Sequence, residues 1–375
     1  MRIVSFNSIS KSKKYLKHLE YLLSDYELIR NKHFSIKCLK ELQPLFSNSN
    51  ILLTHSATAG LEIIAHLLNI EKGDEIILPS FTFVSSANSF VSHGATPIFV
   101  DIEKETLGIN LALVEKAITP KTKAVVAVHY AGHPCDLNRL KGICMKHQIY
   151  LIEDAAMAFG NNFEGIQLGG IGDFGVISFD VTKQISSIQG GLLIVNNKKF
   201  QKRANDIYHN GTNRSNFTKG IVPHYEWVDV GSKYQMNELN AAFLYEDLNQ
   251  FTEVLVTRNK LSKIYYKELL PFENKHQLML MPQELLENNY HEFYVLLKDK
   301  LDRDKCINYL AERAIEAMFH YIPLHNSKKG RLFISNELPN TIEISERLLR
   351  LPLHAEMDEE DVRYIAKQVI SYCDG

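Results

Sequence analysis

Lys183 lies in a short polar segment, 178–184, between two apolar runs at 175–180 and 191–196. This alternation predicts two strands joined by a loop that carries a lysine. A lysine amine on such a loop can hold an aldehyde as a Schiff base when its ammonium is partly desolvated and lies near cationic or dipolar groups, because both conditions favour the neutral amine. For Thr-Lys-Gln taken alone, a solvated surface lysine is the ordinary alternative. The segments around it decide between the two interpretations.

Glu153 and Asp154 end another apolar run, 150–154, and small residues follow them. A strand of an open parallel sheet delivers its last polar side chain to the carboxyl edge of the sheet, where ligands of such sheets bind. Asp154 is thereby placed to pair with a ring nitrogen. Pyridoxal phosphate needs such a carboxylate, because a protonated pyridinium ring is the electron sink for a substrate carbanion. A helix N-cap or a solvated turn is the alternative, and the order and spacing relative to Lys183 favour the cofactor.

A third segment, 51–62, runs from an apolar strand through Ser56, Ala57 and Thr58 into a helical pattern. Small residues let backbone N–H groups approach an anion, hydroxyls add donors, and a helix N-terminus favours negative charge. This pattern predicts a phosphate cup, although an ordinary N-cap is equally compatible with it. Phe83, just after the next apolar run, is placed to cover a cofactor ring, and core packing explains a single phenylalanine equally well.

Apolar runs and helical patterns alternate along the first half of the chain, which predicts an α/β fold with a largely parallel sheet and helices on both faces. The predicted strands are 51–54, 75–79, 97–101, 124–129, 150–154, 175–179 and 191–196, and the predicted helices are 57–70, 84–93, 110–118 and 136–147. The polar segment 209–233 precedes a helix from 236 to about 269. A second unit follows, with a strand at 291–298, a helix at 303–313, a strand through 318–321, and helices near 342–350 and 358–372. We expect a large domain over 1–250 with an N-terminal arm, and a smaller C-terminal α+β domain over 251–375.

The overall composition excludes several classes of protein. A net charge of −2 does not indicate the basic surface that nucleic-acid-binding proteins have. The basic run 11–14 is interpreted as the exposed face of a first helix. No apolar stretch approaches the ~18 residues of a membrane span, and the first residues lack the apolar core of a signal peptide, so a cytoplasmic protein is expected. Five scattered cysteines argue against a disulfide framework and against zinc, and no metal site is expected.

In order and spacing, these segments resemble the fold-type I, pyridoxal-phosphate-dependent sugar aminotransferases of the DegT/DnrJ/EryC1/StrS family over nearly the whole chain. The likeness continues through 128–132, 211–217, 236–242, 319–325 and 345–353. The segments Gly-Thr-Asn-Arg-Ser (211–215) and His-Tyr-Ile-Pro-Leu-His (320–325) look like those of the enzymes that aminate C4 of dTDP-4-keto-6-deoxyglucose.

The resemblance implies roles for individual residues. Lys183 would hold the cofactor and later move protons, and Asp154 would hold the pyridinium nitrogen. The remaining cofactor contacts would come from Ala57, Thr58 and Ser178 at the phosphate, Phe83 on the ring, Met157 and Lys233. Near the nucleotide sugar it implies Asn213, Arg214, His320, Tyr321 and His325.

Some positions depart from the family pattern. Met157 stands where many members have Gln or His, and its thioether cannot donate to the phenolic oxygen of the cofactor. The loop 30–35 lacks the glycines of relatives and is basic instead, Asp180 stands where close relatives often carry His, and Lys233 replaces a small polar residue that reaches across a dimer to the phosphate.

The resemblance also implies a reaction and its partners. L-glutamate would donate the amino group to dTDP-4-keto-6-deoxy-D-glucose in a homodimer with shared active sites, giving a dTDP-4-amino-4,6-dideoxyhexose for surface polysaccharides such as lipopolysaccharide O-antigen. The galactose-type product is slightly favoured. The alternatives are the glucose-type (viosamine) enzyme and a catalytically silent relative that binds pyridoxal phosphate. Other pyridoxal chemistry, such as decarboxylation or cysteine-dependent desulfuration, lacks support in the sugar-type segments.

Overall fold

The computed structural model describes residues 3–8, 12, 14–275, 278–288, 290–333 and 337–375. The basic run at 11–14 is only partly inside these ranges, and helix α1 begins at Lys14. Within the described ranges, none of the helices combines the length and the apolar character that crossing a bilayer requires.

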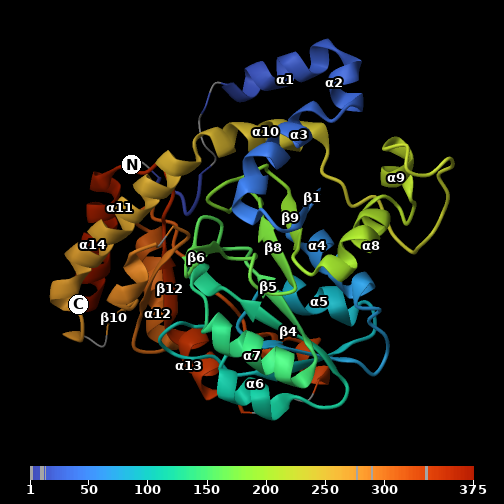
Figure 1. Ribbon diagram of the computed structural model, residues 1–375. Helices are drawn as coiled ribbons and strands as arrows, with labels where there is room; N and C mark the ends of the chain where they lie inside the picture. The colour runs from blue at the N-terminus through green and yellow to red at the C-terminus, as the bar shows by residue number, and fades with distance from the viewer. Residues whose placement is uncertain (1–2, 9–11, 13, 276–277, 289, 334–336) are drawn as a thin grey trace.

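The described residues form a central seven-stranded sheet with the strand order β1-β9-β8-β5-β4-β2-β3. Figure 1 labels β1, β9, β8, β5 and β4 of this sheet. Its strands are β1 (Asn50–Thr54), β2 (Glu75–Pro79), β3 (Thr96–Val100), β4 (Thr122–Val128), β5 (Tyr150–Asp154), β8 (Phe174–Ser178) and β9 (Gly191–Val195). The pairs β2–β3, β2–β4, β4–β5 and β5–β8 are parallel, whereas β9 pairs antiparallel with both β8 and β1. The mostly parallel sheet is confirmed, with each predicted strand in place to within two residues at its ends.

Helices cover both faces of the sheet, because strands that are apolar on both sides must be buried on both. One face packs against α3 (His33–Leu42), α6 (Leu111–Ala117), α7 (Leu137–His147) and α10 (Glu238–Asn249). The other packs against α4 (Ala57–Leu67), α5 (Ser85–Val91) and α8 (Lys198–Tyr208). Ser56, Asn110, Asp136 and Asn197 each accept a backbone N–H at the start of a helix, and this capping explains where four of these helices begin.

Short elements lie around this layered unit. They are α1 (Lys14–Ser24), α2 (Tyr26–Arg30), α9 (Arg214–Thr218), the hairpin β6 (Asn162–Phe163) with β7 (Ile166–Gln167), and the 3-10 helices η1 (Gln43–Phe46), η2 (Tyr130–Gly132), η3 (Leu270–Phe272), η5 (Gln283–Leu286), η6 (Leu324–Asn326) and η7 (Gly330–Leu332). Helix α1 packs on α10, with the rings of Tyr15 and Phe243 stacked 4.8 Å apart. In the glycine-free loop 30–35, Lys32 takes the left-handed conformation (φ 55°) that joins α2 to α3.

The C-terminal part is a smaller α+β unit, as predicted. The antiparallel sheet of β10 (Met279–Leu280), β11 (Phe293–Leu296) and β12 (Leu348–Leu351) packs with α11 (Phe251–Leu269), α12 (Lys300–Ala311), α13 (Pro339–Arg347) and α14 (Glu359–Asp374) around a second core. The domain boundary near residue 250 stays a prediction; in the chain, this position is where α10 ends and α11 begins. The first turns of α11 contact the core of the large sheet, and its last turns, including Tyr265 and Leu269, belong to the second core.

Two elements predicted in this region were wrong. The helical segment predicted from 236 to about 269 is present, but it is interrupted at Gln250, which separates α10 from α11. The segment 318–321 is not a strand but contributes one bridge, between Met318 and Arg350. The helix near 342–350 ends at Arg347, and the next four residues are strand β12, because pairing with β11 overrides their local helical preference.

Candidate active site

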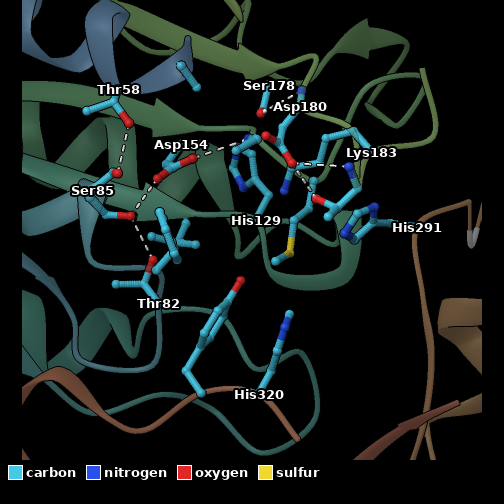
Figure 2. A pocket seen from close by; sticks show the side chains of 18 of the residues that line it. Thr58, Thr82, Ser85, His129, Asp154, Ser178, Asp180, Lys183, His291 and His320 are labelled. Atoms are coloured by element: carbon cyan, nitrogen blue, oxygen red, sulfur yellow. Dashed lines mark hydrogen bonds between the residues drawn. The ribbon is translucent and has the colours of Figure 1, made fainter. Parts of the chain in front are cut away.

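A cavity of about 580 Å³ opens at the carboxyl ends of the parallel strands. Ser178 ends β8, Asp154 ends β5 and His129 follows β4, so all three reach this edge. The C-terminal unit closes the opposite side with the segment 318–322 and Arg350. In Figure 2, Thr58, Ser85 and Asp154 lie on one side of the cavity and Lys183 with His291 on the other. The cavity therefore lies at the carboxyl edge of the sheet, where the sequence predicts a ligand site.

Lys183 reaches this cavity from a tight turn after β8. Its backbone N–H donates to the Asp180 carbonyl (2.9 Å), and the Asp180 carboxylate accepts from the Thr182 N–H (3.1 Å). Burial first, and the positive charge of Arg350 second, lower the pKa of Lys183 to about 8, while Asp154, Asp180 and Glu292 act in the opposite direction. The conditions that favour a neutral amine are therefore present at this lysine.

Asp154 is held in place as a buried carboxylate, only 7% exposed. Ser86 Oγ donates to its Oδ2 (2.6 Å) and the Ala156 N–H donates to its Oδ1 (3.2 Å). Ser86 Oγ also lies 2.7 Å from Thr82 Oγ1. An ionised carboxylate offers about four acceptor positions, so capacity remains for a protonated ring nitrogen.

The N-terminus of α4 forms the cup at the other end of the cavity. Ser56 caps the helix through the Ala59 N–H (3.1 Å), while Ala57 and Thr58 line the cavity, and Thr58 Oγ1 donates to Ser85 Oγ (2.8 Å). Ser56 is therefore the N-cap of α4, and Ser56, Ala57 and Thr58 all line the cavity; phosphate binding by this segment stays a prediction. Strand β9 passes very close, since a side chain at Gly191 would meet the backbone of Ser56 and Ala57.

A buried His129–Glu153 pair underlies this edge of the sheet. His129 Nε2 lies 3.0 Å from Glu153 Oε2, and the carboxylate also accepts the backbone N–H groups of Gly169 (2.9 Å), Ile171 (2.6 Å) and Gly172 (2.7 Å). Burial raises the pKa of Glu153, but His129 and these amides outweigh it and hold the pKa below its usual value. His129 lines the cavity. Its contact with Glu153, the residue before Asp154, fixes the orientation of its ring.

The remaining predicted residues divide into two groups. Phe83, Met157, Ser178, His320 and Tyr321 line the cavity, and Phe83 is 58% exposed, which leaves its ring face open. His325 lies outside the lining and is tied to Ser80 through Nδ1 (2.7 Å). Asn213, Arg214 and Lys233 also lie outside the lining, on the loop that carries α9 (Figure 1). Their roles remain predictions.

Sequence reasoning missed several residues of this site. Ser86, His129, His291 and Arg350 line the cavity without having been assigned to it. A usable signal existed for two of them: His129 is a polar residue directly after a strand, and Arg350 interrupts an otherwise all-leucine strand. Ser86 carried no such signal, since serines are common at helix starts.

Pyridoxal phosphate fits the residues present. The cavity brings together a lysine with a lowered pKa, a buried carboxylate held by Ser86 and a helix N-terminus flanked by hydroxyls. These are the groups that an aldehyde, a pyridine nitrogen and a phosphate need, respectively. Lys183, Asp154 and the Ala57–Thr58 cup are the residues that would hold them.

Comparison with known proteins agrees with this geometry. The model of the DegT/DnrJ/EryC1/StrS aminotransferase family matches residues 35–370. An uncharacterized protein of Methanocaldococcus jannaschii is 33% identical over 318 residues, 82% of each chain. The aminotransferase TlmJ of Streptoalloteichus hindustanus superposes with a TM-score of 0.87 at 25% identity, covering 100% of this chain and 99% of that one. DesI, solved in the presence of its TDP-sugar product, has a TM-score of 0.84 at 24% identity, covering 99% and 93%.

These matches confirm the fold-type I architecture, the family and the cofactor predicted from the sequence. The chain belongs to the DegT/DnrJ/EryC1/StrS aminotransferase family, whose members use pyridoxal phosphate.

Proposed function

We propose that the protein transfers the amino group of L-glutamate to C4 of dTDP-4-keto-6-deoxy-D-glucose, giving a dTDP-4-amino-4,6-dideoxyhexose, with the galactose-type product favoured. The observation that carries the transamination is Lys183, with its lowered pKa, in one cavity with the held carboxylate of Asp154. Segments 211–215 and 320–325 and the TDP-sugar product of DesI support the sugar class. A cytoplasmic location is proposed with this function, because glutamate and nucleotide sugars are cytoplasmic metabolites.

The chain's own residues have defined tasks in such a reaction. Bound pyridoxal phosphate supplies an aldehyde that accepts the amino group and a ring that withdraws electrons from the reacting carbon. Asp154 would favour the protonated ring nitrogen through the negative charge of its carboxylate, which Ser86 holds in place. The neutral Lys183 Nζ takes the proton from the α-carbon of the donor and returns a proton to C4 of the sugar. A pKa near the working pH suits both directions.

We further propose a homodimer in which the loop 209–233 completes the neighbour's site. This loop exposes large apolar side chains: Trp227 is 78% exposed, Ile221 66% and Val230 61%. An apolar surface of this kind favours a protein contact. In the proposed dimer Asn213, Arg214 and Lys233 reach the partner's phosphate and sugar. Light scattering tests this, since a fully active monomer would rule it out.

Substitution of Lys183 tests the transamination. Lys183→Ala is expected to abolish turnover and to remove the visible absorbance of the lysine-bound cofactor, whereas Lys198→Ala, at an exposed lysine on α8, leaves both unchanged. Retention of either property in Lys183→Ala would overturn the assignment.

The substrate is tested separately. Purified protein is incubated with glutamate and dTDP-4-keto-6-deoxyglucose, and the C4 configuration of the product is read from NMR coupling constants. A galacto configuration supports the proposal and a gluco configuration selects the viosamine-type alternative. A catalytically silent relative, the alternative suggested by Met157, would show no spectral change on addition of glutamate.

A further inference from the structure

Lys183 borders a smaller cavity of about 100 Å³, besides the cavity of about 580 Å³ at the edge of the sheet. Gln184, Ser186 and Asp247 line the smaller cavity with it. Among the described residues, Lys183 is the one that the linings of these two cavities have in common. Asp247 lies in the last turn of α10 and is only 6% exposed. Burial of a carboxylate is costly unless hydrogen bonds satisfy it, so the partners of Asp247 show what it is arranged to hold.

The carboxylate of Asp247 joins two parts of the chain that are far apart in sequence. Its Oδ2 accepts the backbone N–H of Ser186 (2.8 Å), three residues after Lys183. Its Oδ1 accepts the hydroxyl group of the buried Tyr15, on helix α1, which lies beside α10 (Figure 1). Hydrogen bonds to a charged acceptor are strong where water is scarce. Asp247 therefore ties α1 to the turn that carries the reacting lysine.

The beginning of this turn is held from another direction. Gln184 follows Lys183 directly, and its Nε2 donates to the carbonyl oxygens of Met157 (3.3 Å) and Phe159 (3.0 Å). These carbonyl groups belong to the segment after β5. The turn is thus fixed to the sheet at Gln184 and to α10 at Ser186.

Ile188 shows that the turn depends on such support. Its φ of 69° lies in the left-handed region, which is costly for a β-branched residue. Ser186 Oγ accepts the Ile188 N–H (2.8 Å), so the strained residue is fixed through Ser186. A backbone conformation of this kind persists only where the surrounding contacts over-determine it. The bond between Ser186 and Asp247 is one of these contacts, and its loss should let the turn relax.

We propose that Asp247 is a positioning residue for Lys183, and that Tyr15 of α1 holds Asp247 in this task. The inference rests on the proposed transamination, in which Lys183 moves protons between fixed atoms, and deepens it by naming what keeps the lysine in place. A displacement of about 1 Å at a reacting group can cost about a hundredfold in rate. Helix α1 thereby contributes to the reaction, although none of its residues is in the lining of the large cavity.

Glu246, the neighbour of Asp247, provides a matched control. It is also buried on α10, and it accepts Ser12 Oγ (2.8 Å) and lies 3.0 Å from His18 Nε2. Within the described residues, no hydrogen bond joins Glu246 to residues 180–190. Glu246→Gln therefore weakens the attachment of α1 and leaves the anchor of the turn in place.

Hydrogen exchange of the apoprotein tests the anchor itself. Burial raises the pKa of Asp247 to about 6, so measurements at pH 8 keep the wild-type carboxylate ionised. In Asp247→Asn, peptides that contain Ser186 should exchange about tenfold faster or more. In Glu246→Gln these peptides should exchange as in the wild type, while peptides of α1 exchange faster. Tyr15→Phe should raise the exchange at Ser186 by a smaller factor, and it supplies the same test if Asp247→Asn does not fold.

Cofactor binding separates the positioning of Lys183 from a general loosening of the site. Pyridoxal phosphate forms a covalent bond with Lys183, whereas pyridoxamine phosphate has no aldehyde and binds only through its ring and phosphate. Asp247→Asn should slow the appearance of the visible absorbance of the lysine-bound cofactor about tenfold or more, and should leave the affinity for pyridoxamine phosphate within about twofold of wild type. Equal losses with both forms, or wild-type exchange at Ser186, would overturn the inference.

The donor half-reaction completes the test. Asp247→Asn should lower its limiting rate about tenfold or more and leave the half-saturating concentration of glutamate unchanged, because geometry and not binding is altered. Glu246→Gln should match the wild type in both. Equal rate losses in the two variants would make the attachment of α1 responsible and refute the role of Asp247. Failure of the wild type to react with any amino acid would instead refute the proposed function, and the exchange and absorbance measurements would still decide the role of Asp247.

Discussion

Glu153 offers a sharp test of how the catalytic edge of the sheet is held together. Its Oε1 accepts the N–H groups of Ile171 and Gly172, and its Oε2 accepts the N–H of Gly169 and faces Nε2 of His129. The side chain is fully buried, so no water can replace a lost partner. Glu153→Gln keeps the shape of this side chain and changes only its charge and one acceptor into a donor.

The expected loss of stability follows from these four contacts. If the amide oxygen takes the place of Oε1, the amide nitrogen meets the Gly169 N–H, donor against donor, while His129 can change tautomer and accept. One bond to a charged acceptor is lost, about 1.5–3 kcal/mol, and one buried N–H is left unpaired, about 1–3 kcal/mol. Glu153→Gln should therefore lower the free energy of unfolding by about 2.5–6 kcal/mol.

Urea unfolding of the apoprotein at pH 7 measures this loss. Glu164→Gln is the matched control, because Glu164 is exposed and accepts one bond from Asn138 Nδ2 (3.0 Å); it should change stability by less than about 0.5 kcal/mol. A Glu153→Gln protein as stable as the control would refute the reasoning.

The pH dependence of this difference has a defined sign. The folded-state pKa of Glu153 lies below its ordinary value of 4.5, so its stabilisation is fully present above about pH 4.5 and is lost as the pH falls through the folded-state pKa. The gap between wild type and Glu153→Gln should be constant from pH 6 to 8 and narrow in acid. A gap that widened in acid would contradict the role of the carboxylate.

Four further predictions concern the cofactor site. Ser86→Ala removes a donor to the charged Asp154 and should weaken cofactor binding about tenfold or more in an absorbance titration, with unchanged affinity as the contrary result. The rate of the donor half-reaction should rise with pH up to about 8, since Lys183 acts as a neutral amine, and a rate that is flat between pH 6 and 8 would exclude this. Because the folded-state pKa of Lys183 is about 8 and its ordinary value is 10.5, Lys183→Met should raise the free energy of unfolding of the apoprotein at pH 7. This gain in stability should shrink between pH 8 and 10.5, as unfolding curves measured over this pH range will show. Gly191→Ala should weaken phosphate binding by displacing the start of α4 at Ala57, so a fluorescence titration with pyridoxal phosphate that matches wild type would disprove that close approach.

Local patterns in the sequence were sufficient to predict the strands of the large sheet and the residues that meet at its carboxyl edge. The strands of the sheet are apolar runs separated by capped helices, and such runs have few alternatives to a buried parallel sheet. Because the carboxyl ends of parallel strands meet at one edge, the positions of Asp154, Ser178 and Lys183 on the edge followed from their places after those runs.

Contacts between residues far apart in the sequence decided the rest. Leu348–Leu351 has the composition of a helix and became strand β12 because β11 was available to pair with it. The pairing of Arg350 with Glu292 joins residues 58 positions apart by number, and each would be a surface charge by composition alone. The burial and pairing of these two charges become visible only when β11, which directly follows Glu292, lies beside β12. The sequence by itself therefore determined which groups carry the chemistry, and the tertiary structure decided how their charges are balanced, because Coulomb energy and desolvation depend on distance in space and not on position along the chain.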